Sequence, residues 1–416
     1  MQSIEVNKNE AGQRLDKLLG KYFNLAGKGF LYKMMRKKNI TLNGKKCDGS
    51  ERLQEGDEIR LFLADETIEK FSQVKVQQVQ ERKLDILYED EHILLVNKPS
   101  GMLSQKAKDT DESLVEYVTG YLLSSGQLTR EQLRSFRPSV CNRLDRNTSG
   151  LVAAGKSLAG LQALSAVFKD RSLQKYYLCV VRGRVKGKQQ IRGTLTKDGI
   201  RNQVTVEMEA GTGAGKETGK IPETEGRRET GGIRRTEGRG RTGEIRGAGG
   251  REDSKAGALI CTEYEPLYYQ EGYTLLKVKL ITGKTHQIRA HLAAVGHPIA
   301  GDYKYGDPGA NAEVKKKYKV RSQMLHSFQM IFPQMPEPLE GLSGKCFIAP
   351  VPGEFGRMFG GVDWQEAARG QEEEEKGQEK AEKRQEKPEK GQEKSEKGQE
   401  RTGREGFAKT GKGQMG

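Results

Sequence analysis

The residues best placed to do chemistry lie in one short stretch, R-L-D-R-N-T-S-G, at positions 143–150. Its carboxylate, Asp145, stands between two arginines, whose charge favours the ionised form that acts as a nucleophile. Turn-forming residues follow, and then an apolar run at 151–154 that is typical of a buried strand. The pattern predicts an ionised aspartate on a loop at the start of a strand, where a scaffold can present it to a ligand. A plain turn former would give the same local pattern, so the stretch alone leaves that alternative open.

This stretch resembles the central motif of the RluA-type pseudouridine synthases, R-L-D-x-x-T-S-G-L, whose aspartate is the catalytic nucleophile. Residues 175–177, K-Y-Y, match the family motif K-x-Y and imply that Tyr177 is the active-site tyrosine. Tyr176 is its competitor, because neighbours on a strand face opposite ways. Residues 282–291, T-G-K-T-H-Q-I-R-A-H, match a third motif and imply that Arg289 pairs with the aspartate. Many members carry His where this chain has Asn142, a departure that we expect to affect substrate fit more than activity.

The resemblance implies an isomerase that converts uridine in RNA to pseudouridine without a cofactor. Asp145 would attack C1′ of the sugar or remove a sugar proton, and the sequence leaves both routes open. Arg289, with Arg143 as a second candidate, would keep the aspartate ionised and oriented. Tyr177 would stack on the base and help to remove the C5 proton. Because the uridine must leave its stack, Arg143 or its neighbours could also fill the gap or hold a phosphate.

Three other interpretations fit the residues less well. A glycosidase would need a second carboxylate paired with Asp145, and none is evident in the motif. A metal site built from His286, His291, His297 and Asp302 is disfavoured, because the spacing of the histidines does not suit one helix face and no H-E-x-x-H is present. A non-catalytic RNA-binding factor for ribosome assembly would explain the basic charge. It would leave the set of Asp145, Tyr177 and Arg289 unexplained.

The sequence around these residues predicts a series of strands and helices. We expect strands on both sides of an acidic turn at 84–101, a helix within 111–136, a buried strand after Asp145 and a helix at 157–169. Further strands are expected at 173–183 and 273–280, with a turn and a helix at 282–292. The segment beyond residue 301 reads as mixed strands and loops. The resemblance implies an α+β fold, a mixed and mainly antiparallel sheet core flanked by helices and loops.

The N-terminal residues form a separate basic unit. The apolar spacing at 15–22 predicts one helix, and a second follows residue 29 with cations at Lys33, Arg36, Lys37 and Lys38. Short strands are expected at 40–42 and 58–62, the first ending in an Asn43-Gly44 turn. Residues 1–64 hold 13 basic and 8 acidic residues. The unit resembles the α-L RNA-binding domain, whose contacts are mostly to phosphate, although a merely solvated helix face would show the same lysines.

Composition sets the remaining boundaries. The 416 residues carry a formal net charge of +15, which favours a polyanionic partner. Residues 209–257 (11 basic, 9 acidic) and 365–416 (13 of each) lack aliphatic periodicity and are expected to be disordered, the first as an extended hairpin loop. We therefore predict an α-L domain at 1–64, a linker at 65–81, a catalytic domain at 82–364 and a tail at 365–416.

Partners and location follow from the same observations. The expected partner is RNA, with ribosomal RNA favoured and transfer RNA possible, because family members with this N-terminal domain act mainly on large-subunit ribosomal RNA. The five scattered cysteines suit a reducing compartment, and no apolar run approaches bilayer length. We expect a cytoplasmic monomer that has no membrane association and no metal.

Overall fold

The computed structural model describes residues 2–73, 83–198, 203–209 and 257–369. The chain divides into two compact units, residues 1–362 and 363–416. Of the second unit, helix α9 (Trp364–Arg369) lies within the described residues. The expectations of disorder for the 209–257 insert and the C-terminal tail therefore fall almost wholly outside them. No helix of the described ranges is long and apolar enough to cross a bilayer.

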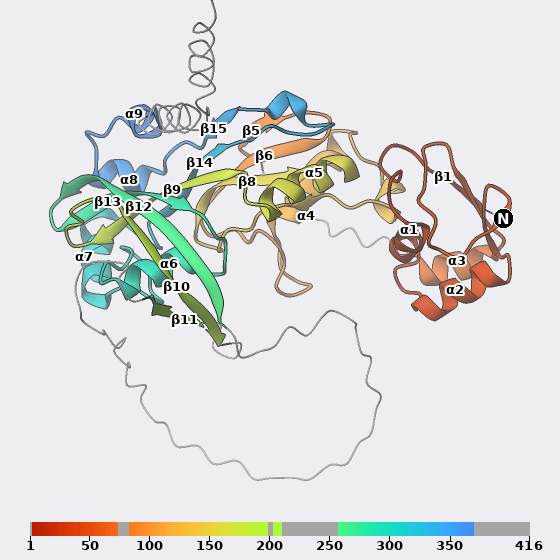
Figure 1. Cartoon of the computed structure of the whole chain (residues 1–416), viewed down its shortest axis with the longest axis horizontal. Helices are drawn as coiled ribbons and strands as arrows, with labels where there is room; N and C mark the ends of the chain where they lie inside the picture. Colours follow the sequence, from red (N-terminus) through yellow and green to blue (C-terminus); the bar gives the residue numbers. More distant parts are fainter. Residues whose placement is uncertain (1, 74–82, 199–202, 210–256, 370–416) are drawn as a thin grey trace, which may run out of the picture. The chain divides into compact units, whose positions relative to one another are not determined.

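The N-terminal region, residues 2–73, has its own sheet and its own apolar core (Figure 1). The sheet has the order β1-β4-β2-β3, and its strands are β1 (Gln2–Glu5), β2 (Ile40–Leu42), β3 (Lys45–Lys46) and β4 (Glu58–Leu61). Helix α1 (Leu15–Tyr22) buries its apolar side chains at the predicted i, i+3, i+4, i+7 positions, and α2 (Lys28–Arg36) follows. Asn43 and Gly44 turn the chain with φ of 49° and 72°, as a two-residue hairpin loop requires. Both helices and the turn are confirmed, whereas β1 was not predicted.

The linker expected at 65–81 is wrong for its first part. Helix α3 (Asp65–Phe71) occupies that stretch, with Ile68 buried in the N-terminal core. The ring of Phe71 packs on Phe30 of α2 with ring centroids 4.7 Å apart. The stretch was predicted as a linker because its composition is polar, and a short helix that buries only one side shows little apolar periodicity. Residues 74–82 lie outside the described residues.

The larger part of the first unit is built on an eleven-stranded sheet. Its main path runs β11-β10-β12-β13-β9-β14-β8-β6-β5, with β15 added to β14 and β7 added to β8. All pairs are antiparallel except β8 with β14, so the α+β fold with a mixed, mainly antiparallel sheet is confirmed. The strands are β5 (Ile86–Glu89), β6 (Ile93–Lys98), β7 (Ser139–Val140), β8 (Ser149–Gly155), β9 (Gln174–Arg182), β10 (Gln189–Asp198), β11 (Gln203–Met208), β12 (Ala258–Gln270), β13 (Tyr273–Leu280), β14 (Leu325–Ile331) and β15 (Cys346–Ile348).

Strand β8, which follows Asp145, lies in the middle of this sheet with all seven residues buried. Val152 and Ala154 join the core on one face, while Leu151 and Ala153 join the core on the other. Side chains of a strand alternate between faces, so a strand covered on both faces reads as a continuous apolar run. This explains why 151–154 lack polar alternation.

Helices cover both faces of the sheet (Figure 1). Helix α5 (Leu158–Lys169) contributes to one core, capped by the Ser157 hydroxyl, which accepts from the Gly160 amide. Helices α4 (Leu114–Ser124) and α6 (Gln287–Ala294) contribute to the other. The expected helix within 111–136 ends at Ser124, and a 3₁₀ turn at Gln132–Arg134 follows.

Two expectations about the second half of the chain are wrong. Residues 203–208 and 258–270 do not form a hairpin across the insert, because β11 and β12 both pair with β10, on opposite sides of it. The segment after residue 301 contains helix α7 (Pro308–Tyr318), started by the Asp307 side chain and by Pro308 in its first turn. That N-terminal signature was readable in the sequence. A second 3₁₀ turn (Glu340–Leu342) and helix α8 (Gly353–Met358) complete this unit.

Candidate active site

Asp145 lies on the loop before β8, as predicted, with 25% of its side chain exposed. The loop closes as a turn in which the Thr148 amide donates to the Asp145 carbonyl at 3.0 Å. Leu144 is buried beside it in the core. A buried anchor on one side and a strand on the other hold the carboxylate at the N-terminal end of β8, where it stays accessible.

Gly150 explains how the loop joins the sheet. Its φ is +108°, and a β carbon there would meet the backbone of Ser327 far inside van der Waals contact. Ser327 is its partner in the parallel pair β8–β14. Only glycine permits this φ and this close approach together, so the fixed glycine of the motif brings the two strands together directly behind Asp145.

The segment after β6 holds the same loop from the other side. The Lys98 ammonium is completely buried and donates to the carbonyls of Pro99, Met102 and Arg146 at 3.0, 2.8 and 3.1 Å. The Gly101 amide donates to the Arg146 carbonyl at 2.9 Å. Burial lowers the pKa of Lys98 to about 7, while the nearby charge of Asp145 acts to raise it. A lysine at the end of an apolar strand therefore ties two loops together through three carbonyl groups.

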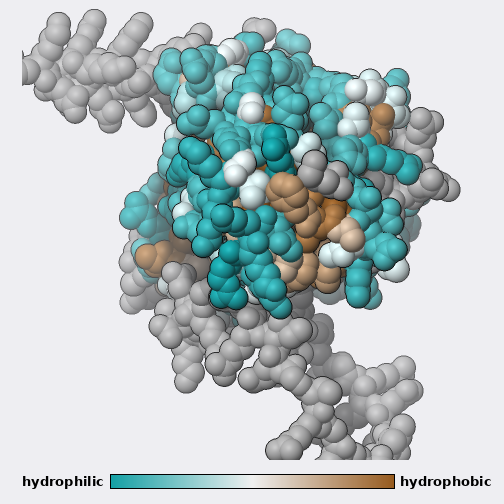
Figure 2. All heavy atoms as spheres, turned by 90° about the vertical axis from the view of Figure 1, so that its right-hand side faces the viewer, coloured by the Kyte–Doolittle hydropathy of each residue, from teal (hydrophilic) through white to brown (hydrophobic). Residues whose placement is uncertain are grey.

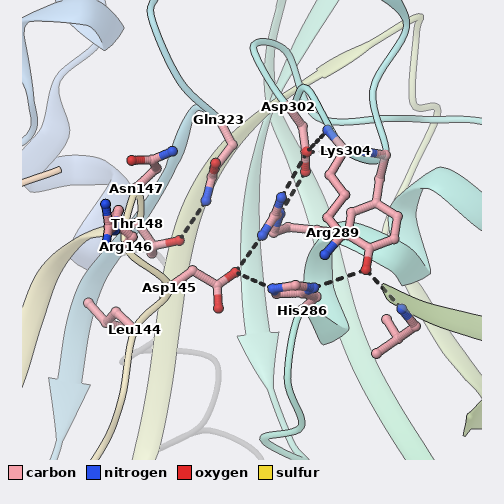
Figure 3. Close-up of polar contacts among 12 residues, drawn as sticks. Leu144, Asp145, Arg146, Asn147, Thr148, His286, Arg289, Asp302, Lys304 and Gln323 are labelled. Carbon is pink, nitrogen blue, oxygen red and sulfur yellow. Dashed lines mark hydrogen bonds and ion pairs between the residues drawn. The ribbon is translucent and has the colours of Figure 1, made fainter. Parts of the chain in front are cut away.

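Arg289 of α6 connects two carboxylates (Figure 3). Its Nη1 donates to Asp145 Oδ2 at 2.7 Å, while Nε and Nη2 donate to the two oxygens of Asp302 at 2.7 and 2.9 Å. Burial alone would lower the pKa of Arg289, but Asp302 and then Asp145 outweigh it and raise the pKa. The bidentate pair fixes the plane of the guanidinium. The predicted pairing of Arg289 with Asp145 is present in this geometry.

From the sequence, Asp302 is a candidate only for the disfavoured metal site. It is fully buried, and its Oδ1 also accepts from the amides of Lys304 and Tyr305 at 2.9 and 3.1 Å. The hydrogen bond and charge of Arg289 outweigh burial and hold its pKa below the usual value. With both oxygens engaged, this second carboxylate orients Arg289 and has no oxygen free for acid–base chemistry.

His286 lies on the other side of Asp145. Its Nε2 is 3.9 Å from Asp145 Oδ2, and its Nδ1 is 2.9 Å from the Tyr305 hydroxyl. The Tyr305 hydroxyl accepts a hydrogen bond from the Val204 amide at 3.0 Å, so its own proton is available to donate to His286 Nδ1. Nδ1 is then the acceptor, and the proton of the neutral imidazole lies on Nε2, which faces the carboxylate. Burial lowers the pKa of His286 against the opposing effect of Asp145, so it presents an N–H dipole at neutral pH.

The two contacts to Asp145 fall on the same oxygen. Arg289 and His286 both approach Oδ2, and within the described parts of the chain no hydrogen bond or ion pair reaches Oδ1. Figure 3 shows Oδ1 pointing away from both partners. One oxygen thus anchors the carboxylate, and the other is left for a reacting atom.

Tyr177, rather than Tyr176, faces this region. Tyr177 lies in the core that contains Leu144, and burial raises its pKa to about 12, with Asp145 acting in the same direction. Tyr176 lies beneath the ammonium groups of Lys277 and Lys279, at 5.0 and 5.6 Å from its ring centroid. Alternation along β9 separates the two rings, as expected.

The structure also places two neighbours of Asp145. The guanidinium of Arg143 is exposed and forms no ion pair with Asp145, so Arg289 takes the orienting role. The Asn142 amide donates to the Leu151 carbonyl at 3.2 Å and accepts from the Ala153 amide at 2.8 Å. Asn142 therefore stabilises the backbone beside β8, and its effect on substrate fit stays a prediction.

The histidines considered as metal ligands are separated by their contacts. His291 is buried with Nδ1 3.0 Å from the Thr262 hydroxyl, and His297 Nδ1 lies 3.1 Å from the Arg182 carbonyl. Within the described ranges, no three His, Cys, Asp or Glu side chains form a group that could hold a metal ion. His286 belongs to the site of Asp145 instead.

The four predicted RNA-binding cations lie apart from Asp145 in sequence, on and just after α2. Lys33, Arg36, Lys37 and Lys38 are all exposed. Lys33 and Arg36 line a pocket of about 370 Å³ together with Tyr32, whose ring is exposed. Figure 2 shows this end of the molecule as largely hydrophilic, interrupted by a compact hydrophobic patch.

The chain is similar to several known proteins. The family model described as RNA pseudouridylate synthase matches residues 92–294, a range that contains Asp145, Tyr177 and Arg289. The ribosomal large subunit pseudouridine synthase C of Vibrio vulnificus is 27% identical over 351 residues, covering 82% of this chain and 91% of that protein. Its namesake from Escherichia coli K12 is 29% identical over 312 residues, covering 73% and 79%. Among solved structures, Human RNA Pseudouridylate Synthase Domain Containing 4 aligns with a TM-score of 0.45 at 18% identity, over 66% of this chain and 92% of that one.

Proposed function

We propose that the chain is an RNA pseudouridylate synthase and that it isomerises uridines of large-subunit ribosomal RNA with Asp145 as the nucleophile. The observation that carries the role of Asp145 is the anchoring of Oδ2 by Arg289 at 2.7 Å while Oδ1 stays free. The ribosomal substrate is supported by the names of the curated relatives, which are large-subunit enzymes.

The reaction needs little more than these groups. On one route Oδ1 of Asp145 attacks C1′ as the N-glycosidic bond breaks, and this new C–O bond breaks again when C5 of the turned uracil joins C1′. On the other route Asp145 removes a sugar proton as the N-glycosidic bond breaks, and returns that proton to the sugar when C5 joins C1′. Loss of the C5 proton restores the aromatic base. A guanidinium held by Asp302 keeps the Asp145 carboxylate in one orientation throughout, so the protein spends no free energy on reorganising it during the reaction.

We assign Tyr177 a stacking and hydrogen-bonding role. A phenol with a pKa of about 12 stays protonated at neutral pH, and an efficient general base has a pKa closer to the working pH. Tyr177 can therefore hold the turning base against the core, while another acceptor or water takes the C5 proton.

A hydrolytic glycosidase fits the site less well. Inverting and retaining glycosidases both need a second carboxyl group free to act as acid or base. Asp302 shares Arg289 with Asp145, but its oxygens already accept hydrogen bonds from Arg289 and from two backbone amides. A role as a non-catalytic assembly factor would leave the oriented carboxylate without a purpose.

The N-terminal region is proposed to bind RNA in the manner of an α-L domain. Its support is the row of exposed cations Lys33, Arg36, Lys37 and Lys38, none of which forms an ion pair with a described residue. Replacing all four by glutamine should weaken RNA binding and reduce the dependence of affinity on salt, because each phosphate contact contributes about one unit to the salt slope. An unchanged slope would remove the phosphate-binding role.

The decisive experiment uses ribosomal RNA transcribed with tritium at uridine C5. Release of tritium by the wild-type chain, but not by Asp145→Asn, is the expected result. Release by both would move the nucleophile away from Asp145. Release by neither, with RNA binding intact, would contradict the ribosomal substrate, and transfer RNA labelled in the same way would then be tested.

A further inference from the structure

A second concave site lies at the far end of β9, between the turn after β9 and the end of β12. It has a volume of about 450 Å³ and is lined by Arg184, Val185, Lys186 and residues 266–269. Tyr268 and Tyr269 are 41% and 47% exposed there. The lining thus combines two cations and two aromatic rings with no carboxylate, which is the composition of a site for a polyanion with flat, stackable groups.

The cations of this site come from one basic segment, residues 182–188, with the sequence R-G-R-V-K-G-K. Its outer members are neutralised: Arg182 pairs with Asp307 at 2.9 Å, and Lys188 pairs with Glu263 at 3.2 Å. The inner members, Arg184 and Lys186, are exposed and form no ion pair within the described residues. Their positive charge is therefore left for a ligand from outside the chain.

The backbone fixes the segment in place. The Val185 amide donates to the Thr274 hydroxyl at 3.1 Å, and the same hydroxyl donates to the Gly183 carbonyl at 2.6 Å. Val185 is buried in the main core. Because one residue of the segment points inward and is held on both sides, its neighbours Arg184 and Lys186 project outward together.

An irregularity in β12 presents the two tyrosines. The register of β12 with β13 shifts between Pro266 and Tyr268, and a bulge of this kind re-aims the side chains that follow it. Arg184 lies over the ring of Tyr269, with its guanidinium carbon 4.9 Å from the ring centroid. This cation–π pair fixes one wall of the site and leaves the ring of Tyr268 beside it exposed.

We propose that this site binds a single-stranded segment of the RNA substrate, with a base stacked on Tyr268 and phosphates held by Arg184 and Lys186. The inference rests on the proposed function, because it takes the ligand to be the same RNA that enters the site of Asp145. From Tyr177 to Arg182 the strand β9 spans five residues, or about 17 Å at roughly 3.3 Å per residue. One RNA chain can therefore reach both places, and nucleotides next to the target uridine would be held here during the reaction.

The test maps contact directly. Full-length protein carrying Asp145→Asn is cross-linked by light to a ribosomal RNA fragment containing 4-thiouridine, and the modified residues are identified by mass spectrometry. We expect cross-links at Tyr268 or Tyr269. Cross-links confined to other surfaces would overturn the proposal. This readout needs no turnover, so it stands even if the isomerisation of ribosomal RNA fails.

Kinetics with a matched control complete the test. Tyr268→Ala should raise KM for the long fragment about five- to tenfold with kcat unchanged, since stacking is lost, whereas Tyr268→Phe should keep the wild-type KM. Lys186→Gln should lower the salt slope of binding by about one. The control Leu259→Ala lies on the same strand outside the site and is 69% exposed; it should change nothing.

Two results would contradict the assignment to RNA. One is an unchanged KM in Tyr268→Ala. The other is cross-linking at Tyr268 that a polyglutamate chain abolishes, while the RNA affinity of the protein stays the same. The second result would identify the ligand as an acidic peptide.

Discussion

At the scale of single residues, the site is an arrangement of charges around one oxygen of Asp145. Arg289 supplies a full positive charge at 2.7 Å and His286 an N–H dipole at 3.9 Å. Neither residue is free to turn, because Asp302 holds the guanidinium and Tyr305 holds the imidazole. The chemistry of the carboxylate therefore depends on two side chains that need not touch the substrate.

The hold on Arg289 can be tested with Asp302→Asn. The amide cannot form the bidentate ion pair, so the guanidinium loses its fixed plane. We expect kcat for tritium release to fall on the order of 10- to 100-fold with KM little changed, as a small misplacement at a reacting group produces. Asp307→Asn is the matched control. Asp307 lies in the same loop as Asp302, but it pairs with Arg182 and touches neither Arg289 nor Asp145. A full kcat in Asp302→Asn would remove the orienting role.

The hold on His286 predicts a smaller effect for Tyr305→Phe. Loss of the hydroxyl frees the imidazole and leaves the Val204 amide without its acceptor. We expect kcat to fall by about tenfold, near the cost of one misplaced hydrogen-bonding group. Tyr303→Phe, at a ring that is 62% exposed two residues earlier, should leave kcat unchanged. Equal kinetics for the two variants would show that His286 needs no support.

At the scale of elements, three strands meet behind Asp145. Gly150 of β8 pairs with Ser327 of β14, and Ser327 pairs with Tyr177 of β9. The strand that follows Asp145 and the strand that carries Tyr177 are thus joined through Ser327, although 32 positions separate Asp145 from Tyr177. The register of β8 with β14 decides whether the two groups meet.

Gly150→Ala should disrupt that register. The new β carbon would collide with the Ser327 backbone and would also occupy a positive φ. Together these effects should cost about 3 kcal/mol or more in the free energy of unfolding measured with urea. Gly272→Ala separates the cost of the positive φ from the cost of the collision, because Gly272 has φ +82° with no atom within 4 Å of an added β carbon. It should cost only about 1 kcal/mol, and equal losses would show that packing against β14 is unimportant.

At the scale of the whole molecule, stability should depend on pH through buried histidines. His291 and His326 are completely buried, and burial lowers the pKa of each to about 4 from 6.5. Between pH 6.5 and 4 the unfolded chain binds the additional protons, so the free energy of unfolding falls as the solution is acidified. Each histidine accounts for on the order of 3 kcal/mol over this window.

Urea unfolding at several pH values checks this. His291→Gln should reduce the loss between pH 6.5 and 4 by about half, since glutamine does not titrate. The wild-type chain measured under the same conditions supplies the reference slope. If His291→Gln also kept that slope, the acid sensitivity would have to arise elsewhere.

The sequence by itself determined most local elements and named the candidate reacting groups. The apolar run after Asp145, the amphipathic spacing of α1 and the Asn43-Gly44 turn each encode structure over a few residues, and all three were correctly predicted. The family motifs pointed to Asp145, Tyr177 and Arg289. Where the local signal was weak or overlooked, as for α3 and α7, the prediction failed.

Only the tertiary structure decided how the site is supported. Lys98, Asp302 and Tyr305 reach the site through contacts between distant segments, and the Arg289–Asp145 pair alone spans 144 positions. Such contacts depend on strand order and register, which periodicity does not encode, because it reports the environment of each residue and not its partner. For the same reason Arg143, only two positions before Asp145 in the sequence, does not pair with it.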